Sequence, residues 1–314
     1  MKPRISSIFG VIIILTIVSC SFPKEDLTKV NIFAPGNVNT HMSERDAALS
    51  TDGQIFLFSV QLTRQESTIC YSTKLNNKWI RPLVAKFSGK YMDIEPVFHP
   101  DGRLFFVSNR PLPGETEAND FNIWYVSQTE EGWTTPQPLD TIVNSTGNEF
   151  YPSFTTNGDM YFTATLPGGK GSEDIWVSRF VEGNYTQPEN LGDSINTSNF
   201  EYNSFISPDG SFLMLTTHGR GEGYGGGDLY ISFKDEEGNW KVPVNMGPKV
   251  NTEGLEFCPS LSPDGKILFF TRRNIPKPEN ERWSYIELMS NASSLENGRG
   301  NIYYISSDFI NDLK

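Results

Sequence analysis

The chain has 314 residues and a formal net charge of −12 at pH 7, with 13% aromatic and 20% charged residues. This acidic balance argues against a nucleic-acid partner, because proteins that bind nucleic acid present a basic face to the phosphates. It also argues against direct docking on anionic lipid headgroups.

Residues 1–19 are expected to form a lipoprotein signal peptide. Lys2 and Arg4 precede an apolar stretch at 8–18 that is short for a membrane span. The stretch ends in Ile17-Val18-Ser19-Cys20, which resembles the lipobox of lipoprotein precursors. We expect Cys20 to be lipidated and residues 20–27 to form a polar tether. An ordinary signal peptide followed by a chance cysteine is the alternative.

Lipidation would place the protein at the outer membrane, on its periplasmic or cell-surface side. Each buried methylene of an acyl chain adds roughly 0.8 kcal/mol, so several chains give stable anchoring. Lys24-Glu25-Asp26 is similar to a signal that sends some lipoproteins to the outer face, and a solvated linker explains it equally well. Loss of Lys2 and Arg4 leaves 24 basic and 38 acidic residues, a net charge of −14.

Residues 28–314 repeat one pattern five times. A turn dipeptide that accepts positive φ recurs every 49 to 56 residues and precedes a short apolar run typical of a buried strand. The five dipeptides are Asp52-Gly53, Asp101-Gly102, Asn157-Gly158, Asp209-Gly210 and Asp264-Gly265. A third strand follows each run after a polar loop, as at 123–126 and 175–177.

A fourth strand is marked in four copies by an aromatic residue with a proline three positions later. These pairs are Trp79 and Pro82, Trp133 and Pro136, Tyr185 and Pro188, and Trp240 and Pro243. Four short antiparallel strands per repeat predict the blade of a β-propeller. We therefore expect an all-β fold of five blades, each with four antiparallel strands.

The fifth copy lacks a fourth strand, and the N-terminus supplies a candidate. The Asn-Thr linker that follows the fourth strand elsewhere, as at Asn251-Thr252, also occurs at Asn39-Thr40. Residues near Val30 to Phe33 are therefore predicted to be the outer strand of the last blade. That strand would close the ring and leave no free sheet edge.

These motifs together resemble the WD40-like repeats of the TolB-type propeller superfamily. The pattern runs Glu-x-x-Pro-Ser-x-Ser-Pro-Asp-Gly, then Asp-Ile-Trp, then Asn-Leu-Gly and Ile-Asn-Thr, with good copies at 256–270, 174–176, 190–192 and 195–197. The resemblance covers about residues 28–314 and implies a propeller. Because TolB itself has six blades, a six-bladed ring is the alternative. The repeat serves many roles, so the resemblance implies little about function.

An acid stands eight residues before each turn, at the entrance to the innermost strand. The five acids are Glu44, Asp93, Glu149, Glu201 and Glu256. They could ring the mouth of the central channel and attract a cation or cationic groups. The alternative, which better suits a residue repeated in every blade, is that each acid accepts structural hydrogen bonds from neighbouring groups.

The loops between the second and third strands should emerge on the same face as the acids. The last of these loops, 274–300, is the longest and carries residue types enriched at binding hot spots. An insertion without a binding role is the alternative. The candidate contacts on this face are Arg110, Arg220, Arg272, Arg273, Arg282, Trp283 and Tyr285.

Motifs for catalysis are weak in this chain. The three histidines lack metal-type spacing, and no cofactor site is expected apart from a cation at the channel mouth. We expect a non-catalytic envelope module that binds a protein or glycan. The alternative is a glycan-active hydrolase or lyase that uses the channel-mouth acids, although such an enzyme needs acids in unlike environments. Cys70 and Cys258 are expected to be buried free thiols in neighbouring blades.

Overall fold

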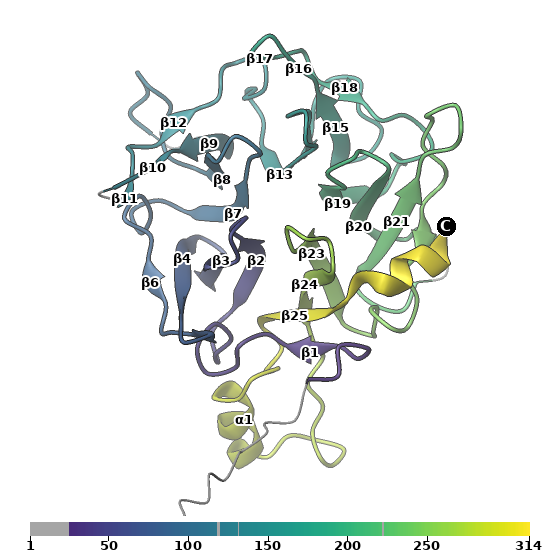
Figure 1. Ribbon diagram of the computed structural model, residues 1–314. Helices are drawn as coiled ribbons and strands as arrows, with labels where there is room; N and C mark the ends of the chain where they lie inside the picture. The colour runs from purple at the N-terminus through teal and green to yellow at the C-terminus, as the bar shows by residue number, and fades with distance from the viewer. Residues whose placement is uncertain (1–24, 118–119, 131, 222) are drawn as a thin grey trace, which may run out of the picture.

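The computed structural model describes residues 25–117, 120–130, 132–221 and 223–314. Within these ranges five antiparallel sheets surround a central axis (Figure 1). The predicted five-bladed all-β propeller is confirmed, and the six-bladed alternative is wrong. The predicted signal peptide and the lipidation site Cys20 lie outside the described residues.

Each of the first four blades has its innermost strand first in the chain and its outer strand last. The first contains β2 (Glu44–Leu49), β3 (Ile55–Thr63), β4 (Glu66–Leu75) and β6 (Leu83–Val84), with β5 (Lys78–Trp79) also paired to β4. The second contains β7 (Asp93–Phe98), β8 (Leu104–Ser108), β9 (Asn122–Val126) and β12 (Gln137–Pro138). The third contains β13 (Glu149–Phe154), β14 (Met160–Ala164), β15 (Asp174–Ser178) and β18 (Glu189–Asn190). The fourth contains β19 (Phe200–Ile206), β20 (Phe212–His218), β21 (Asp228–Phe233) and β22 (Val244–Asn245).

The last blade is built from both ends of the chain. It contains β23 (Leu255–Leu261), β24 (Ile267–Arg273), β25 (Gly300–Ser306) and β1 (Asn31–Ile32). In β1, Asn31 lies opposite Tyr304 and Ile32 opposite Tyr303. The predicted closure by the N-terminal strand is therefore confirmed.

The last residues of the predicted tether already lie against this blade. The Tyr304 hydroxyl donates a hydrogen bond to the Glu25 carboxylate. The backbone N–H of Ser306 donates to the carbonyl of Leu27 at 2.9 Å. Glu25 and Leu27 are therefore part of the surface packed against the last blade.

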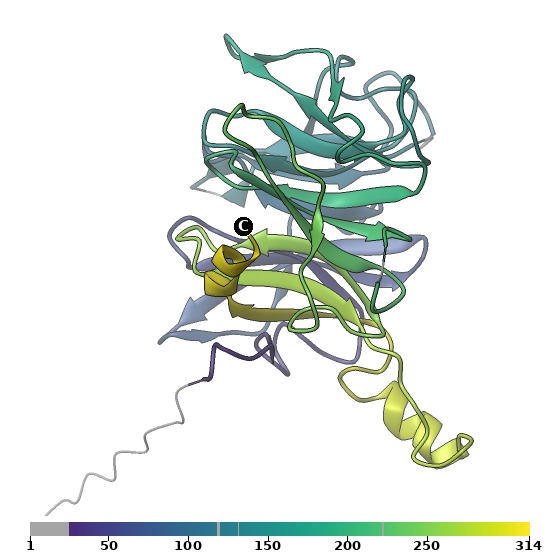
Figure 2. The same cartoon turned by 90° about the vertical axis from the view of Figure 1, so that its right-hand side faces the viewer.

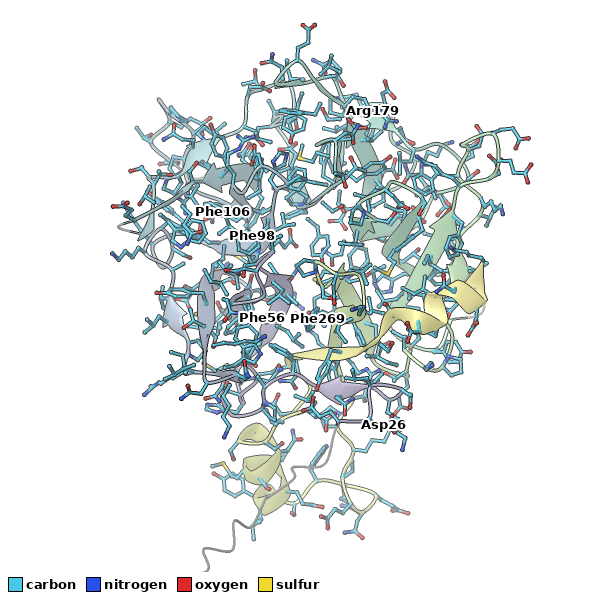
Figure 3. All side chains as sticks on the ribbon, viewed as in Figure 1. Asp26, Phe56, Phe98, Phe106, Arg179 and Phe269 are labelled. Carbon is cyan, nitrogen blue, oxygen red and sulfur yellow. The ribbon has the colours of Figure 1, made fainter. Side chains whose placement is uncertain are left out.

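Aromatic packing holds the closing seam together. The ring of Phe33, directly after β1, lies 4.3 Å from Phe56 of the first blade and 5.3 Å from Phe269 of the last, measured between centroids. Phe56 and Phe269 lie side by side across this seam (Figure 3). Such contacts between sheets bury the apolar faces of both blades at once.

The outer strands begin slightly later than the aromatic markers suggest. Trp133 and Tyr185 lie in small hairpins, β10 (Gln128–Thr129) with β11 (Gly132–Trp133) and β16 (Phe180–Val181) with β17 (Asn184–Tyr185). The outer strand follows the proline in each case, as Gln137–Pro138 follows Pro136. The proline stands where the chain turns into an edge strand, which tolerates its missing N–H.

Two helical segments escape the sequence analysis. A short α1 (Tyr285–Ala292) lies within the long last loop, and a 3₁₀ helix η1 (Ser307–Leu313) ends the chain. Helix α1 projects away from the propeller and buries none of its residues (Figures 1 and 2). No helix in the described part of the chain is long and apolar enough to cross a membrane.

The two cysteines are free, as expected, and lie in neighbouring blades. Cys258 of β23 is buried, whereas Cys70 of β4 is only half-buried, which corrects the expectation that both are buried. Burial raises the pKa of the Cys70 thiol to about 11. Both thiols therefore stay protonated near neutral pH.

Replacing Phe33 with alanine should destabilise the ring by about 2 kcal/mol, because a half-buried aromatic side chain is lost from the seam. Chemical denaturation of the full chain measures this change. Leu75→Ala serves as the control, since Leu75 is 62% exposed and should change the free energy of unfolding little. Equal stability of the two variants would contradict the role assigned to the seam.

Candidate functional site

The five repeated acids lie in the joints between blades. All five side chains are fully buried, at 0% exposure. At the last joint the Thr252 hydroxyl donates to Glu256 Oε1 at 2.6 Å and the Thr252 N–H donates to Oε2 at 3.0 Å. Thr197 makes the same pair of bonds to Glu201, Ser145 bonds Glu149 through both groups, and the Thr40 hydroxyl bonds Glu44. This geometry favours the structural interpretation over a ring of solvent-facing carboxylates.

An asparagine at the position of the Asn in the Ile-Asn-Thr motif completes four of the five joints. Asn251 Nδ2 donates to the carbonyl of Leu229, and its Oδ1 accepts from the Leu229 N–H, both at 2.9 Å. Asn39, Asn144 and Asn196 bond Ile302, Ile123 and Ile175 in the same way. The motif therefore joins the third strand of one blade to the first strand of the next.

At the second joint, a single serine bonds both the third strand of one blade and the acid of the next. The Ser88 hydroxyl accepts from the Ile69 N–H at 3.0 Å and donates to Asp93 Oδ2 at 2.7 Å. This joint has the one aspartate among the five acids, and Arg110 lies 2.6 Å from it.

Three of the predicted face contacts belong to these joints. Arg110 pairs with Asp93 at 2.6 Å, Arg272 with Glu256 at 2.7 Å and Arg220 with Glu201 at 3.5 Å, and their side chains are 9–12% exposed. Three others, Arg282, Trp283 and Tyr285, lie on the protruding loop, where Tyr285 is 77% exposed. Within the described ranges, no three His, Cys, Asp or Glu side chains are grouped to hold a metal ion.

The residue two positions after each acid has an unusual backbone. All five have φ between 49° and 66°, and the register of every innermost strand shifts at this point. They are Asp46, Glu95, Tyr151, Asn203 and Cys258. Left-handed non-glycine residues cost of order 1–3 kcal/mol each and tend to occur at functional sites. Sequence reasoning missed them, although Asp46, Glu95 and Asn203 are polar residues at a fixed offset from the repeated acids, which is a readable signal.

These bulges and Arg45 form a buried cluster that we name the central plug: Arg45, Asp46, Glu95, Tyr151, Asn203 and Cys258. Arg45 Nε donates to Asp46 Oδ1 at 2.7 Å, and Arg45 Nη2 donates to Glu95 Oε1 at 2.9 Å and to Cys258 Sγ at 3.3 Å. Burial, opposed by Arg45, raises the pKa of Glu95 to about 8. An ion cluster this deep is stabilising only when its polar atoms find partners.

The plug satisfies its own carboxylates. Glu95 Oε2 accepts from the Tyr151 N–H at 2.6 Å, and Asn203 Nδ2 donates to Oε1 at 3.3 Å. Asp46 Oδ2 accepts from the Glu95 N–H at 3.1 Å. Every carboxylate oxygen in the plug therefore has a donor.

One cavity lies on the hairpin-turn side of the plug. It has a volume of about 220 Å³, and Asp46, Glu95 and Tyr151 are among its lining residues. Its wall is largely apolar, with Phe98, Phe154, Phe205, Leu49 and Leu261 contributed by all five innermost strands. The apolar wall gives this side of the ring few groups for polar recognition.

Two further cavities lie on the side of the loops between second and third strands. The first, of about 260 Å³, is lined by Arg45, Glu95, Glu173, Tyr202 and Arg273 among others. The second, of about 360 Å³, shares Arg45 and Arg273 and adds Arg64 and Arg299. Of the predicted face contacts, Arg273 is the one placed in these cavities.

Two glutamates at the same repeat position should respond oppositely to substitution. Burial raises the pKa of Glu149 to about 7, and no cation lies within 4 Å of it in the described residues. The folded state thus retains this proton to higher pH than the unfolded state, so wild-type stability falls as pH rises from about 4.5 to 7. Glu149→Gln should remove this loss. Its free energy of unfolding should therefore exceed that of wild type by about 1–3 kcal/mol between pH 5 and 8.

Glu256→Gln should instead lower the free energy of unfolding by about 2 kcal/mol, because it leaves Arg272 without its buried partner. Denaturant titrations of both variants at pH 5 and pH 8 measure the contrast. The same pH response in both would contradict the difference assigned to the two joints.

Comparison with known proteins identifies the fold. No protein-family model and no curated protein sequence matches the chain. The catalytic domain of an α-L-arabinofuranosidase from Coprinopsis cinerea is similar in structure, with 11% identity and a TM-score of 0.51, over 89% of this chain and 97% of that one. An α-L-arabinofuranosidase from Lactobacillus brevis matches at 10% identity and a TM-score of 0.51, over 86% of this chain and 92% of that one.

TolB from Acinetobacter baumannii shares 14% identity at a TM-score of 0.48, and the match covers 85% of this chain but 55% of that one. At these identities the likeness extends to the fold and not to the role. Over the residues that the structure describes, the chain is a five-bladed β-propeller, the fold that its sequence motifs predict.

Proposed function

We propose that the chain is a lipid-anchored, non-catalytic binding module of the cell envelope. It presents the face formed by the loops between second and third strands to a protein or glycan. The propeller supplies the rigid scaffold, and loops on such scaffolds commonly carry recognition. Nucleic acid is not the expected partner of a chain with a net charge of −12.

The central plug is the observation that carries this proposal. A general acid must aim a proton at the substrate, and a general base must offer a free oxygen. Both carboxylates of the plug instead have all their oxygens engaged by Arg45, Asn203 and backbone N–H groups. The side chains of Asp46 and Glu95 are 1% and 3% exposed. This arrangement supports a structural core rather than a catalytic pair.

A glycan-active hydrolase is the second candidate, and one feature favours it. Burial raises the pKa of Glu95 to about 8, and this residue lines cavities on both sides of the plug. A carboxylic acid that stays protonated at neutral pH is what a glycosidase needs as its proton donor. An enzyme of this kind would lose turnover in Glu95→Gln while its fold is retained, and binding without turnover in wild type contradicts this candidate.

Cys20→Ala should release the protein into the soluble fraction, because it removes the expected lipid attachment site. Cys70→Ala is the matched control and should leave the protein in the membrane fraction. Fractionation of cells that express each variant measures the outcome. Membrane association of Cys20→Ala equal to that of wild type would overturn the lipid anchor.

Helix α1 offers a test of the presenting face. Ile286 is 81% exposed on this helix, and Val181 is 54% exposed on a hairpin of the third blade. Ile286→Asp and deletion of 276–298 should each reduce recovery of a cross-linked partner from the cell surface severalfold. Val181→Asp should leave it unchanged. Equal recovery by all variants would exclude this loop from the contact.

A further inference from the structure

We propose that the two adjoining cavities around Arg273, which we name the arginine cleft, bind the carboxylate groups of an acidic glycan. This inference rests on the proposed binding function and names a ligand class for it. The arginine cleft lies on the side of the ring from which the 274–300 loop departs, directly after Arg273 at the end of β24.

Arg273 is a half-buried cation without an anionic partner. Its Nη2 donates to Gln61 Oε1 at 3.4 Å, and its guanidinium lies 5.2 Å from the centroid of Phe257. No carboxylate of the described residues lies within 4 Å of it, whereas the adjacent Arg272 is paired with Glu256 at 2.7 Å. Burial and the neighbouring Arg45 lower the pKa of Arg273, so its surroundings disfavour the charge that it carries. A bound anion would compensate this charge.

The outer part of the arginine cleft adds two more cations. Arg64 is exposed in the turn between β3 and β4 and contacts no partner among the described residues. Arg299 is exposed and donates to the carbonyl of His41 at 3.4 Å. The 360 Å³ cavity that they line has no Asp or Glu in its wall. Guanidinium groups match carboxylates through two parallel hydrogen bonds.

The positive charge of this cavity stands out on a chain whose overall net charge is −12. A local positive potential attracts an anion to one place, while the acidic remainder of the surface repels it. The acids that face the inner cavity are Glu95, which Arg45 engages, and the half-buried Glu173, whose pKa is raised by burial. Neither pairs with Arg273.

The shape favours a glycan over a protein. The two cavities are open and small, with volumes of about 260 and 360 Å³ that lie just below and just above the lower limit for small-ligand sites, roughly 300–1,000 Å³. Protein partners commonly need about 800 Å² of surface on each side. The inner wall also includes the rings of Tyr202 and Phe150 and the hydroxyl-bearing Thr163. Aromatic faces beside a hydroxyl group suit a sugar ring, and the arginines supply the anionic specificity.

The test uses the purified full chain and isothermal titration with a galacturonic acid trimer. Its carboxyl-reduced, neutral counterpart is the comparison ligand. We expect the acidic trimer to bind at least tenfold more tightly than the neutral one, and less tightly as salt concentration rises. Arg273→Gln should weaken binding of the acidic trimer at least tenfold, and Arg64→Gln about threefold.

Arg81→Gln is the matched control, because Arg81 is exposed outside the cleft and should leave affinity unchanged. Arg64→Gln keeps the test valid if Arg273→Gln fails to fold, since Arg64 contacts nothing that the fold needs. Unchanged affinity in the cleft variants, absence of binding by wild type, or equal binding of the neutral trimer would overturn the inference.

Two outcomes separate this inference from the proposed function. If a hexaglutamate peptide binds more tightly than the galacturonic acid trimer, and this binding depends on the cleft arginines, the assignment to a glycan is wrong. Recovery of a surface partner that depends on the 276–298 loop, without binding of the acidic trimer, would preserve the binding function and reject the arginine cleft as its site.

Discussion

The hydrogen bond from a linker hydroxyl to a fully buried acid is the interaction on which this propeller depends. It occurs at every joint, through Thr40, Ser88, Ser145, Thr197 or Thr252. A carboxylate at such a depth would be costly without partners, so the joint holds only when the linker and the next innermost strand are in register. The acid therefore fixes where each innermost strand begins, and the bulge two residues later is carried to the centre of the ring.

Repeat symmetry separates the structural residues from those that can carry recognition. The joints use nearly the same chemistry five times, whereas the plug uses five different residue types at one equivalent position. The arginines show the same division, because Arg272 completes a joint while Arg273 lines the cleft. Side chains at positions where the five repeats differ do not take part in the joint contacts that all blades share. The plug and the arginine cleft meet this condition, and both include Arg45.

The sequence predicts the fold well because its signals are local and recur. Asp-Gly turns and the displaced Asn39-Thr40 linker suffice to count the blades and to assign the closing strand. The sequence places the five acids correctly at the start of each innermost strand. Their complete burial depends on how neighbouring sheets pack, which no local pattern shows. Arg272 and Arg273 are adjacent and identical in the sequence. Because successive side chains of a strand point to opposite faces, the two residues have different surroundings. Helix α1 is too short for a periodic signal, although Ser284 and Glu287 form a readable capping box.

The closing strand also sets the order in which the molecule can be assembled. The pairing of Asn31 with Tyr304 joins positions about 270 residues apart, and contacts this distant in sequence form slowly because loop-closure entropy opposes them. During synthesis the N-terminal segment is made first and has no partner until β25 has been made. Until β1 pairs with β25, the nearly complete ring has an open edge at β25, where other chains can pair. Tension on the N-terminus of the finished protein acts first on the bonds of Glu25 and Leu27 to this blade and then on the two residue pairs of β1. The strand nearest the N-terminus is thus the last to be placed and the first to be pulled away.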